Sequence, residues 1–492
     1  MGQSDKLNAV IIGAGIASLA AAIRLSACGL SVVVCEQSST YGGKLGVWQK
    51  EGFRFDTGPS LFTMPNYVLE LLQIDGKNNV SFSYDKLEVL CNYFWEDDTR
   101  LVAYHDADKL MQEFEQKLNE PAKNIRKFLR KSAQKYSVTN HVFLEKSLHR
   151  SSTYLNWKTI VSMMRIRQVG VFKNMNSENQ QLFDNPKTVQ FFNRYATYNG
   201  SNPYKSPATL NVIPHYEFGI GAYFPNKGMR SIVDVLYQKA LKLGVEFKFN
   251  TPVNRLIKSK DGYRVDDEKL LYDIVLCNSD VATAVQGPLK GLLKPKTKQY
   301  EPSSSALIFY WGISRVFDEL DLHNIFFSAD YNKEFHSIFE DGTIDDDPTV
   351  YVQISSKLKH DDAPKGKENW FVMVNAPYVV DQDWQSLIEQ TRKNILTKLS
   401  RVLKVDVQSL IEVEHILTPQ MIWDKTGSHK GALYGSSSNN KWSAFLRQPN
   451  FSKEHKGLYF CGGSVHPGGG IPLCLLSAKI STDIIKSDFK IC

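Results

Sequence analysis

Apolar residues near the start of the chain form two uninterrupted runs with a helical segment between them. Residues 9–12 and 31–35 are short runs without polar alternation, which is typical of strands buried on both faces of a parallel sheet. Between them, after a glycine-containing turn, the apolar residues of 19–25 recur at helical spacing, and Gly29 ends the segment. The pattern predicts a strand, a turn, a helix and a second strand, which is the framework of a βαβ unit.

Further along the chain, segments that alternate or run apolar predict the strands of a second sheet. The segments with this pattern are 87–106, 304–314, 349–355 and 370–375. Residues 107–140 have a pattern typical of helix, and 246–253 predict one more strand. Near the end, 458–461 predict a strand that is followed by a helix over about 473–485.

Size and composition narrow the class of protein. A chain of 492 residues is too long for one compact core, so two packed units are expected. The net charge of +7 is modest, and no nucleic-acid-binding signature accompanies it, so we expect no nucleic-acid partner. Seven scattered cysteines without a C-x-x-C pair argue against a disulfide framework and against a metal site, and they suit a reducing cytoplasm. The polar N-terminus predicts no signal peptide, and no apolar run has the roughly 18 residues needed to cross a bilayer.

The first turn carries the residues of a nucleotide site. Gly13 permits the tight turn, and Gly15 lets a pyrophosphate approach the backbone at the positive end of the following helix. Glu36, directly after the second strand, can accept hydrogen bonds from both ribose hydroxyls. Ser18 stands where the third glycine of the fingerprint is usual, and serine is small enough for close packing of helix and strand.

Two later segments favour FAD over a nicotinamide cofactor. Gly42-Gly43-Lys44 follows the acid closely, and Asp56-Thr57-Gly58-Pro59 comes soon after. A second glycine-rich turn with a basic residue suits the remaining phosphate and the ribityl face of a flavin. Near the C-terminus, Gly462 and Gly463 precede residues 466–472, whose sequence is His-Pro-Gly-Gly-Gly-Ile-Pro. The backbone N–H groups of such a turn can lie against a ring where side chains would clash.

These motifs together resemble a known family. Glu36, the 42–44 turn, Pro225-Asn226-Lys227-Gly228-Met229 and the 466–472 segment are similar to the bacterial carotenoid desaturases of the phytoene desaturase type, within the flavin amine oxidase superfamily. The similarity extends over essentially the whole chain. The 466–472 segment is its most discriminating motif, because amine oxidases lack it in this form. The chain resembles the hydroxycarotenoid 3,4-desaturase branch somewhat more than the phytoene enzymes.

The resemblance implies FAD as the cofactor and a role for each matching residue. Gly13, Gly15 and Glu36 would bind the ADP half, while Val253 would meet the adenine through its backbone. Lys44 and Leu45 would lie by the pyrophosphate, Gly228 and Met229 near the ring, and 462–472 along the ribityl chain and the isoalloxazine. The cofactor-binding residues expected in full are Gly13, Gly15, Ile16, Ala17, Glu36, Gly43, Lys44, Leu45, Gly58, Pro59, Ser60, Gly228, Met229, Val253, Asn278, Gly462, Gly463, His466, Gly470, Ile471 and Pro472.

Because nucleotide motifs lie at both ends, the FAD-binding domain must be discontinuous. We expect an α/β protein with a Rossmann-type FAD-binding domain and an α+β substrate domain built on a mixed sheet. The FAD-binding domain is assigned to 1–84, 215–288 and 427–492, and the substrate domain to 85–214 and 289–426. The sequence leaves the oligomeric state open.

Two amphipathic basic segments, 123–135 and 157–173, bear on localisation. A cationic helix with an apolar stripe either lies in a membrane interface or packs its stripe on the core. Because a carotenoid is dissolved in lipid, we expect a cytoplasmic protein that binds peripherally to the inner face of the cell membrane. The 157–173 segment is the better candidate for that contact.

The resemblance implies desaturation of an acyclic or hydroxylated C40 carotenoid, with a hydride passing to the flavin. His215 and Glu217 are weak candidates for a base, and the alternative is a packed histidine and a surface glutamate. Two other functions stay open: a flavin amine oxidase, and a non-catalytic prenyl- or lipid-binding protein on the same fold. The first should convert a soluble amine, and the second should not hold FAD.

Overall fold

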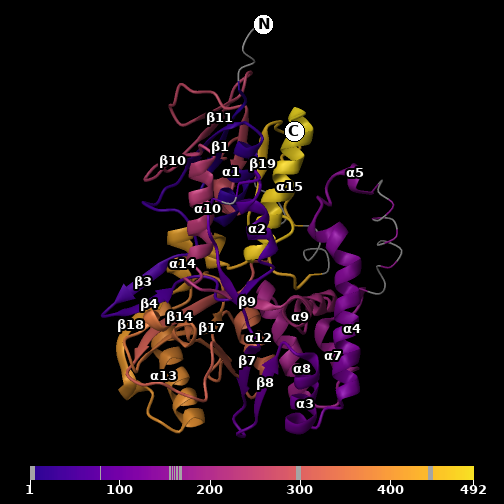
Figure 1. Ribbon diagram of the computed structural model, residues 1–492, viewed down its shortest axis with the longest axis vertical. Helices are drawn as coiled ribbons and strands as arrows, with labels where there is room; N and C mark the ends of the chain where they lie inside the picture. The colour runs from indigo at the N-terminus through magenta and orange to yellow at the C-terminus, as the bar shows by residue number, and fades with distance from the viewer. Residues whose placement is uncertain are drawn as a thin grey trace.

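The computed structural model describes the chain except for residues 1–5, 78, 155–156, 158, 160, 162–164, 166–168, 295–300, 441–446 and 492. The described residues form two lobes, one on a parallel sheet and the other on a larger mixed sheet (Figure 1). The first strand and the last helix lie together in the first lobe, although they come from opposite ends of the sequence.

The parallel sheet has the strand order β10-β2-β1-β13-β19, and every pair of neighbours is parallel. Its strands are β1 (Asn8–Ile12), β2 (Ser31–Cys35), β10 (Glu246–Lys248), β13 (Ile274–Cys277) and β19 (Leu458–Phe460). Helix α1 (Ile16–Ala27) packs against α10 (Ser231–Lys242) and α15 (Ile471–Phe489), and its fully buried alanines 20–22 permit the close approach. Since the strands are parallel, their carboxyl ends meet at one edge of the sheet.

The mixed sheet has the order β18-β14-β17-β16-β15-β7-β8, in which β15 and β7 are parallel and the other pairs are antiparallel. Its strands are β7 (Val89–Phe94), β8 (Arg100–Tyr104), β14 (Ser305–Ile313), β15 (His323–Phe326), β16 (Val350–Gln353), β17 (Glu368–Ala376) and β18 (Ile411–Leu417). One face packs on α13 (Trp384–Leu403), where Phe309 and Trp311 meet Ile395 in a buried cluster. The other face turns toward the first lobe, and the Tyr310 hydroxyl donates to the carbonyl of Thr57 over 3.1 Å. The two sheets confirm the predicted fold class.

A helical group beside the mixed sheet completes the second lobe. It contains α3 (Ala107–Leu118), α4 (Ala122–Thr139), α7 (Met175–Gln180), α8 (Pro186–Asn193) and α9 (Ile213–His215). The single helix predicted over 107–140 is wrong, because Asn119 adopts a left-handed conformation and Pro121 cannot continue the α3 hydrogen bonds. In α4 the apolar stripe, with Ile125 and Phe128, is buried against the core. The 123–135 segment is thus a core-packed helix in which most basic residues are exposed, whereas Lys135 is buried and pairs with Glu178.

The remaining described strands and α-helices are shorter elements. They are β3 (Val47–Lys50), β4 (Phe53–Asp56), β5 (Phe62–Thr63), β6 (Tyr84–Lys86), β9 (Ala222–Pro225), β11 (Leu256–Lys258), β12 (Tyr263–Val265), α2 (Asn66–Leu72), α5 (Ser151–Tyr154), α11 (Val281–Gln286), α12 (Tyr331–His336) and α14 (Pro419–Thr426). The strand predicted over 246–253 ends at Lys248, because Asn250 has a φ of +52° and Pro252 has no N–H for a ladder. In the described part of the chain, no helix combines the length and apolarity that a membrane span requires.

The cysteines depart from expectation in one respect. Cys28, directly after α1, is disulfide-bonded, whereas Cys35, Cys91, Cys277, Cys461 and Cys474 are free thiols. An odd number of scattered cysteines carries no information about which thiols meet in space, so this bond could not be predicted from the cysteine spacing.

Candidate functional site

A cavity of about 760 Å³ lies between the two lobes. One part of its wall is the carboxyl-end edge of the parallel sheet, together with the first turns of α1 and α15. The other part is the inner face of the mixed sheet. This is the edge at which open parallel sheets bind their ligands, and the volume is in the range of cofactor and substrate sites.

Two glycine turns meet at the first part of the wall. Gly13 has a φ of +90°, which glycine adopts without strain, and it lets the chain turn from β1 toward α1. The Gly42 N–H donates to the Ala14 carbonyl over 2.8 Å, so the two turns lie side by side. The Glu36 carboxylate accepts the Ala14 N–H over 2.6 Å, which fixes this acid beside the first turn.

Two helices begin at the cavity with open N-termini. Helix α1 starts after Gly15 and helix α15 after Gly470, and neither has a side-chain cap among the described residues. Their first backbone N–H groups and the positive ends of their dipoles therefore remain available to an anion or to polar atoms of a ring. Both N-termini belong to segments in which the sequence predicts cofactor binding.

Asn278, at the carboxyl end of β13, links the N-terminal and C-terminal segments. Its side-chain N–H donates to the Cys461 carbonyl over 3.0 Å, and its Oδ1 accepts the Ser18 hydroxyl over 2.9 Å. A Cβ on Gly15 would lie 2.7 Å from this Oδ1, and a Cβ on Gly462 would collide with the Nδ2. The two glycines thus make room for the amide, and the serine in the third fingerprint position has a hydrogen bond of its own.

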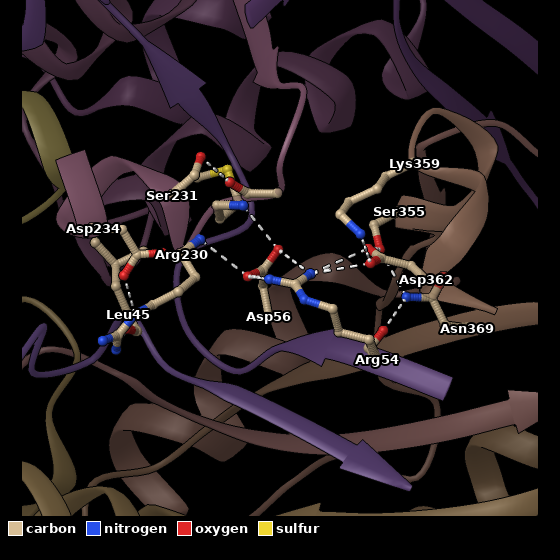
Figure 2. A network of polar contacts seen from close by, with 12 residues as sticks. Leu45, Arg54, Asp56, Arg230, Ser231, Asp234, Ser355, Lys359, Asp362 and Asn369 are labelled. Atoms are coloured by element: carbon tan, nitrogen blue, oxygen red, sulfur yellow. Dashed lines mark hydrogen bonds and ion pairs between the residues drawn. The ribbon is translucent and has the colours of Figure 1, made fainter. Parts of the chain in front are cut away.

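A network of ion pairs holds the segment after β4 in place. Asp56 accepts the backbone N–H of Met229 over 2.8 Å and that of Arg230 over 3.0 Å (Figure 2). The same carboxylate pairs with the Arg54 guanidinium over 2.9 Å, and Arg54 lies 3.2 Å from the fully buried carboxylate of Asp362. The network therefore ties β4 and the 229–230 segment to the mixed-sheet lobe.

The same network supports the 42–45 turn. The Arg230 guanidinium donates to the carbonyls of Tyr41, over 3.0 Å, and Leu45, over 2.8 Å. A Cβ on Gly58 would collide with the Lys44 carbonyl oxygen, so glycine is required where the two segments cross. Arg230, directly after the 225–229 motif, thus acts as a clamp on the glycine turn.

Lys44 brings a cation to the cavity wall. Its Nζ donates to the Leu433 carbonyl over 2.8 Å, and burial lowers its pKa, while the Asp280 carboxylate opposes that shift. Burial raises the pKa of Asp280, which accepts the N–H of Ala282 at the start of α11. A desolvated cation beside an open helix N-terminus favours an anionic ligand such as a pyrophosphate.

Most of the residues predicted to bind the cofactor line this cavity. They are Gly13, Gly15, Ile16, Ala17, Glu36, Gly43, Lys44, Leu45, Gly58, Pro59, Ser60, Val253, Asn278, Gly462, Gly463, Gly470, Ile471 and Pro472. With two glycine turns, two open helix N-termini and a fixed acid at the end of β2, this part of the wall fits FAD.

Gly228, Met229 and His466 do not belong to the cavity lining. Met229 is fully buried behind the 42–45 turn, where its N–H is used by Asp56. The His466 ring is 3% exposed and its Nε2 pairs with the Lys146 carbonyl over 2.9 Å. These residues lie behind the ones that line the cavity. The resemblance, in contrast, implied that they approach the ring directly.

The second part of the wall is an apolar chamber on the mixed sheet. Side chains that point to the same face of neighbouring strands line it: Ile308, Tyr310, Ile325, Tyr351, Phe371, Met373 and Leu417. Strand alternation explains this selection, because the intervening residues pack on α13. Such a surface suits an extended apolar molecule.

A charged cluster closes one end of the chamber. Glu217 is 3% exposed, and its carboxylate accepts the hydroxyls of Tyr195, over 2.7 Å, and Tyr198. The Arg194 guanidinium lies 3.8 Å from the same carboxylate and stacks on the Tyr195 ring with 4.3 Å to its centroid. Glu217 lines the cavity, so the alternative of a surface glutamate is wrong. His215 does not line it and packs against the Tyr136 ring at 4.8 Å, as a packed histidine does.

A hydrogen-bonded chain links this end to the cofactor part of the wall. The Tyr351 hydroxyl donates to the Ser60 hydroxyl over 2.8 Å and contacts the Nδ1 of His323 at 2.7 Å. Burial lowers the pKa of His323 to about 3, and the nearby Arg194 adds to the shift. The imidazole is therefore neutral at physiological pH.

Several residues of the site had no signal in the sequence. Arg194 and Tyr198 share one short helix, whereas His323 lies on β15 and Tyr351 on β16. These residues follow no motif, so their proximity in the cavity wall depends on the fold. Asp280 is an exception, because polar residues just after a buried parallel strand are positioned at the binding edge.

The chain is similar to known proteins over nearly its whole length. The model of the family described as flavin containing amine oxidoreductase matches residues 16–485. A 1-hydroxycarotenoid 3,4-desaturase from Flavobacterium sp. is 48% identical over 97% of this chain and 99% of its own length. A 4,4'-diapolycopene oxygenase from Methylomonas sp. is 30% identical over 100% of both chains. Among solved structures, cyclohexylamine oxidase from Brevibacterium oxydans aligns with a TM-score of 0.62 and 13% identity over 99% of this chain and 100% of that chain, which shows a shared fold.

Proposed function

The chain belongs to the flavin-containing amine oxidoreductase family, and we propose that it desaturates carotenoids. The protein is an FAD-dependent oxidoreductase. The observation that carries the substrate class is the 48% identity, over nearly the full length of both chains, to a 1-hydroxycarotenoid 3,4-desaturase. The apolar chamber beside the glycine turns supports it, because a long polyene needs a continuous apolar surface next to the cofactor.

The proposed reaction removes two hydrogens from adjacent carbons and leaves a C=C bond. When bound, FAD supplies a ring that accepts a hydride from the allylic carbon. The neighbouring carbon loses a proton, so the two hydrogens that are removed leave as one hydride and one proton. The cation that forms between these losses is delocalised along the polyene, and the chamber contributes chiefly by holding the chain in position.

Each part of the cavity wall has a role in the proposed reaction. The turns at Gly13 and Gly43, with Glu36, hold the nucleotide, and the 462–472 segment holds the flavin. Glu217 is the anionic side chain placed to accept the proton or to stabilise the cation, because it is buried at the end of the chamber. The division into an FAD-binding domain of 1–84, 215–288 and 427–492 and a substrate domain of 85–214 and 289–426 is part of the proposal.

The test is anaerobic mixing of FAD-loaded protein with detergent-dispersed carotenoids, followed by absorbance at about 450 nm, where the oxidised flavin absorbs. Bleaching with a red shift of the polyene spectrum is expected for a hydroxylated acyclic carotenoid. Putrescine and cyclohexylamine serve as soluble amine controls. Bleaching by an amine but by no carotenoid would move the assignment to an amine oxidase. Protein that cannot be loaded with FAD would indicate a non-catalytic lipid-binding relative.

We further propose that the protein binds peripherally to the inner face of the cell membrane through residues 157–173. Residues 158, 160, 162–164 and 166–168 of this segment lie outside the described residues. Trp157 is 71% exposed and Phe172 is 72% exposed, the highest values among the large hydrophobic side chains that the structure describes. Aromatic side chains beside exposed basic ones, here Arg165 and Lys173, suit an interface with anionic lipid.

Sedimentation with vesicles of anionic phospholipid tests the membrane proposal. Replacing both aromatics, Trp157→Ser and Phe172→Ser, should weaken binding by about 100- to 10,000-fold, since each fully buried ring contributes about 1.5–3 kcal/mol and the two together about 3–6 kcal/mol. Val380→Ser is the matched control, because Val380 is 57% exposed on another part of the surface. Equal binding of the double variant and the control would refute the role of the segment.

A further inference from the structure

The charged end of the chamber holds two buried polar atoms that have no hydrogen-bond partner among the described residues. They are the Nε of Arg194 and the Nε2 of His323. Both side chains line the cavity, with residue exposures of 6% and 4%. A buried polar atom without a partner is costly, so two of them in one cavity wall point to a ligand group that pairs with them.

The hydrogen-bonded chain defines what His323 offers. The Tyr351 hydroxyl gives its single hydrogen to Ser60, so its oxygen must accept from the Nδ1–H of His323. The proton of the neutral ring is therefore on Nδ1. It follows that Nε2 carries a lone pair and can only accept a hydrogen bond.

Arg194 offers the opposite character. One of its terminal nitrogens donates to the Tyr198 hydroxyl over 3.0 Å, and the other lies 3.8 Å from the Glu217 carboxylate. The buried Nε–H is a donor without a hydrogen-bond partner among the described residues. The guanidinium is held by stacking on Tyr195, so this donor is positioned before a ligand arrives. One donor and one acceptor in the same wall match an alcohol, which both donates and accepts.

We propose that Arg194 and His323 form a subsite for the hydroxyl group of a carotenoid substrate. This inference rests on the proposed desaturase function and adds the group that selects the substrate. In a 1-hydroxycarotenoid that is desaturated between carbons 3 and 4, the hydroxyl carbon is two bonds from the reacting position, so the hydroxyl must lie beside the flavin. The chain from His323 through Tyr351 ends at Ser60, in the turn where the flavin is expected, which meets that requirement.

The subsite also explains why a substrate without the hydroxyl would be rejected. A hydrocarbon end in this place removes any water from the wall and leaves the Nε–H and Nε2 unpaired. Sites that hydrogen-bond a substrate hydroxyl discriminate strongly against the analogue that lacks it, whereas an apolar pocket discriminates little between the two. The rest of the polyene would extend over Ile308 and Met373 along the apolar part of the chamber.

The test compares a 1-hydroxycarotenoid with the same polyene in which hydrogen replaces the hydroxyl. Flavin bleaching rates give the ratio of the two substrates, and tryptophan quenching in dithionite-reduced protein, which cannot turn over, gives the two dissociation constants. His323→Phe is expected to reduce both ratios by about 10- to 100-fold, because the hydrogen bond to the hydroxyl is lost. Met373→Leu is the matched control on the same sheet face, and it should change the values for both substrates alike.

The outcomes distinguish a failure of the hydroxyl subsite from a failure of the proposed desaturase function. If both polyenes bleach the flavin of the wild-type protein at equal rates, the hydroxyl subsite is refuted and the desaturase function is retained. Wild-type protein that is bleached by neither would overturn the proposed function itself. If His323→Phe does not fold or retain FAD, Tyr351→Phe takes its place, because it keeps the ring and removes the hydroxyl that orients His323. An unchanged ratio in the folded variant would then refute the proposal.

Discussion

Replacement of Asn278 by alanine tests how the two ends of the chain are joined at the cofactor site. The substitution removes the hydrogen bond to the Cys461 carbonyl, 3.0 Å long, and the one from the Ser18 hydroxyl, 2.9 Å long. Leaving such buried groups without a partner costs about 1–3 kcal/mol. We expect Asn278→Ala to lower the free energy of unfolding of the FAD-loaded protein by about 2 kcal/mol.

The assay is urea unfolding monitored by the fluorescence of released FAD. With a denaturant slope of about 3 kcal/mol per M, a loss of about 2 kcal/mol shifts the midpoint down by about 0.7 M. If the substitution destabilises only the FAD-bound state, by the full 2 kcal/mol or so, FAD affinity falls by about 30-fold. Ser18→Ala removes one of the two contacts and should cost about 1 kcal/mol.

The double variant supplies the sharper test. Ser18→Ala and Asn278→Ala remove the same hydrogen bond, so their combined cost must be smaller than the sum of the single costs. A loss below about 0.5 kcal/mol for Asn278→Ala, or strict additivity in the double variant, would refute the reasoning. It would mean that the strand pairing of β13 and β19 holds the two segments without the amide.

Three further predictions concern the cavity and its support. Gly58→Ala should reduce FAD affinity by at least about 100-fold in fluorescence titration, because the new Cβ collides with the Lys44 carbonyl oxygen in the supporting turn; near-normal affinity would contradict this. Glu217→Gln should slow flavin bleaching by carotenoid by about 100-fold with FAD binding intact, whereas His215→Ala should change it less than about 3-fold; the reverse order would assign the base to the histidine. Burial lowers the pKa of the His466 ring from 6.5 to about 3. Between these two pH values the unfolded chain binds a proton that the folded protein does not bind. The stability that is present above pH 6.5 is therefore lost as the pH falls. His466→Gln should therefore make the difference in unfolding free energy between pH 7 and pH 5 smaller by about 2 kcal/mol, and an unchanged difference would show that the ring is not held neutral.

Local sequence patterns were sufficient to predict the nucleotide-binding part of the site. The run 9–12, the glycine turn and Glu36 are adjacent in sequence, and their order fixes the βαβ unit because a parallel pair with a helical crossover has one favoured hand. The 466–472 segment was found by its glycines in the same way. The direct roles inferred for Gly228, Met229 and His466 differ from their positions in the structure, because a motif marks a required residue without showing whether it faces the ligand or the wall behind it.

The βαβ framework, the class of cofactor and the family could all be predicted from residues that are close together along the chain, because each depends on short-range order. Tertiary structure decided the rest. Arg194, His323 and Tyr351 come from a helix and from two strands of the mixed sheet, and nothing in their spacing places them in one cavity wall. Their meeting follows from the pairing of distant strands and from the packing of one lobe on the other, which bury polar atoms together that are far apart along the chain.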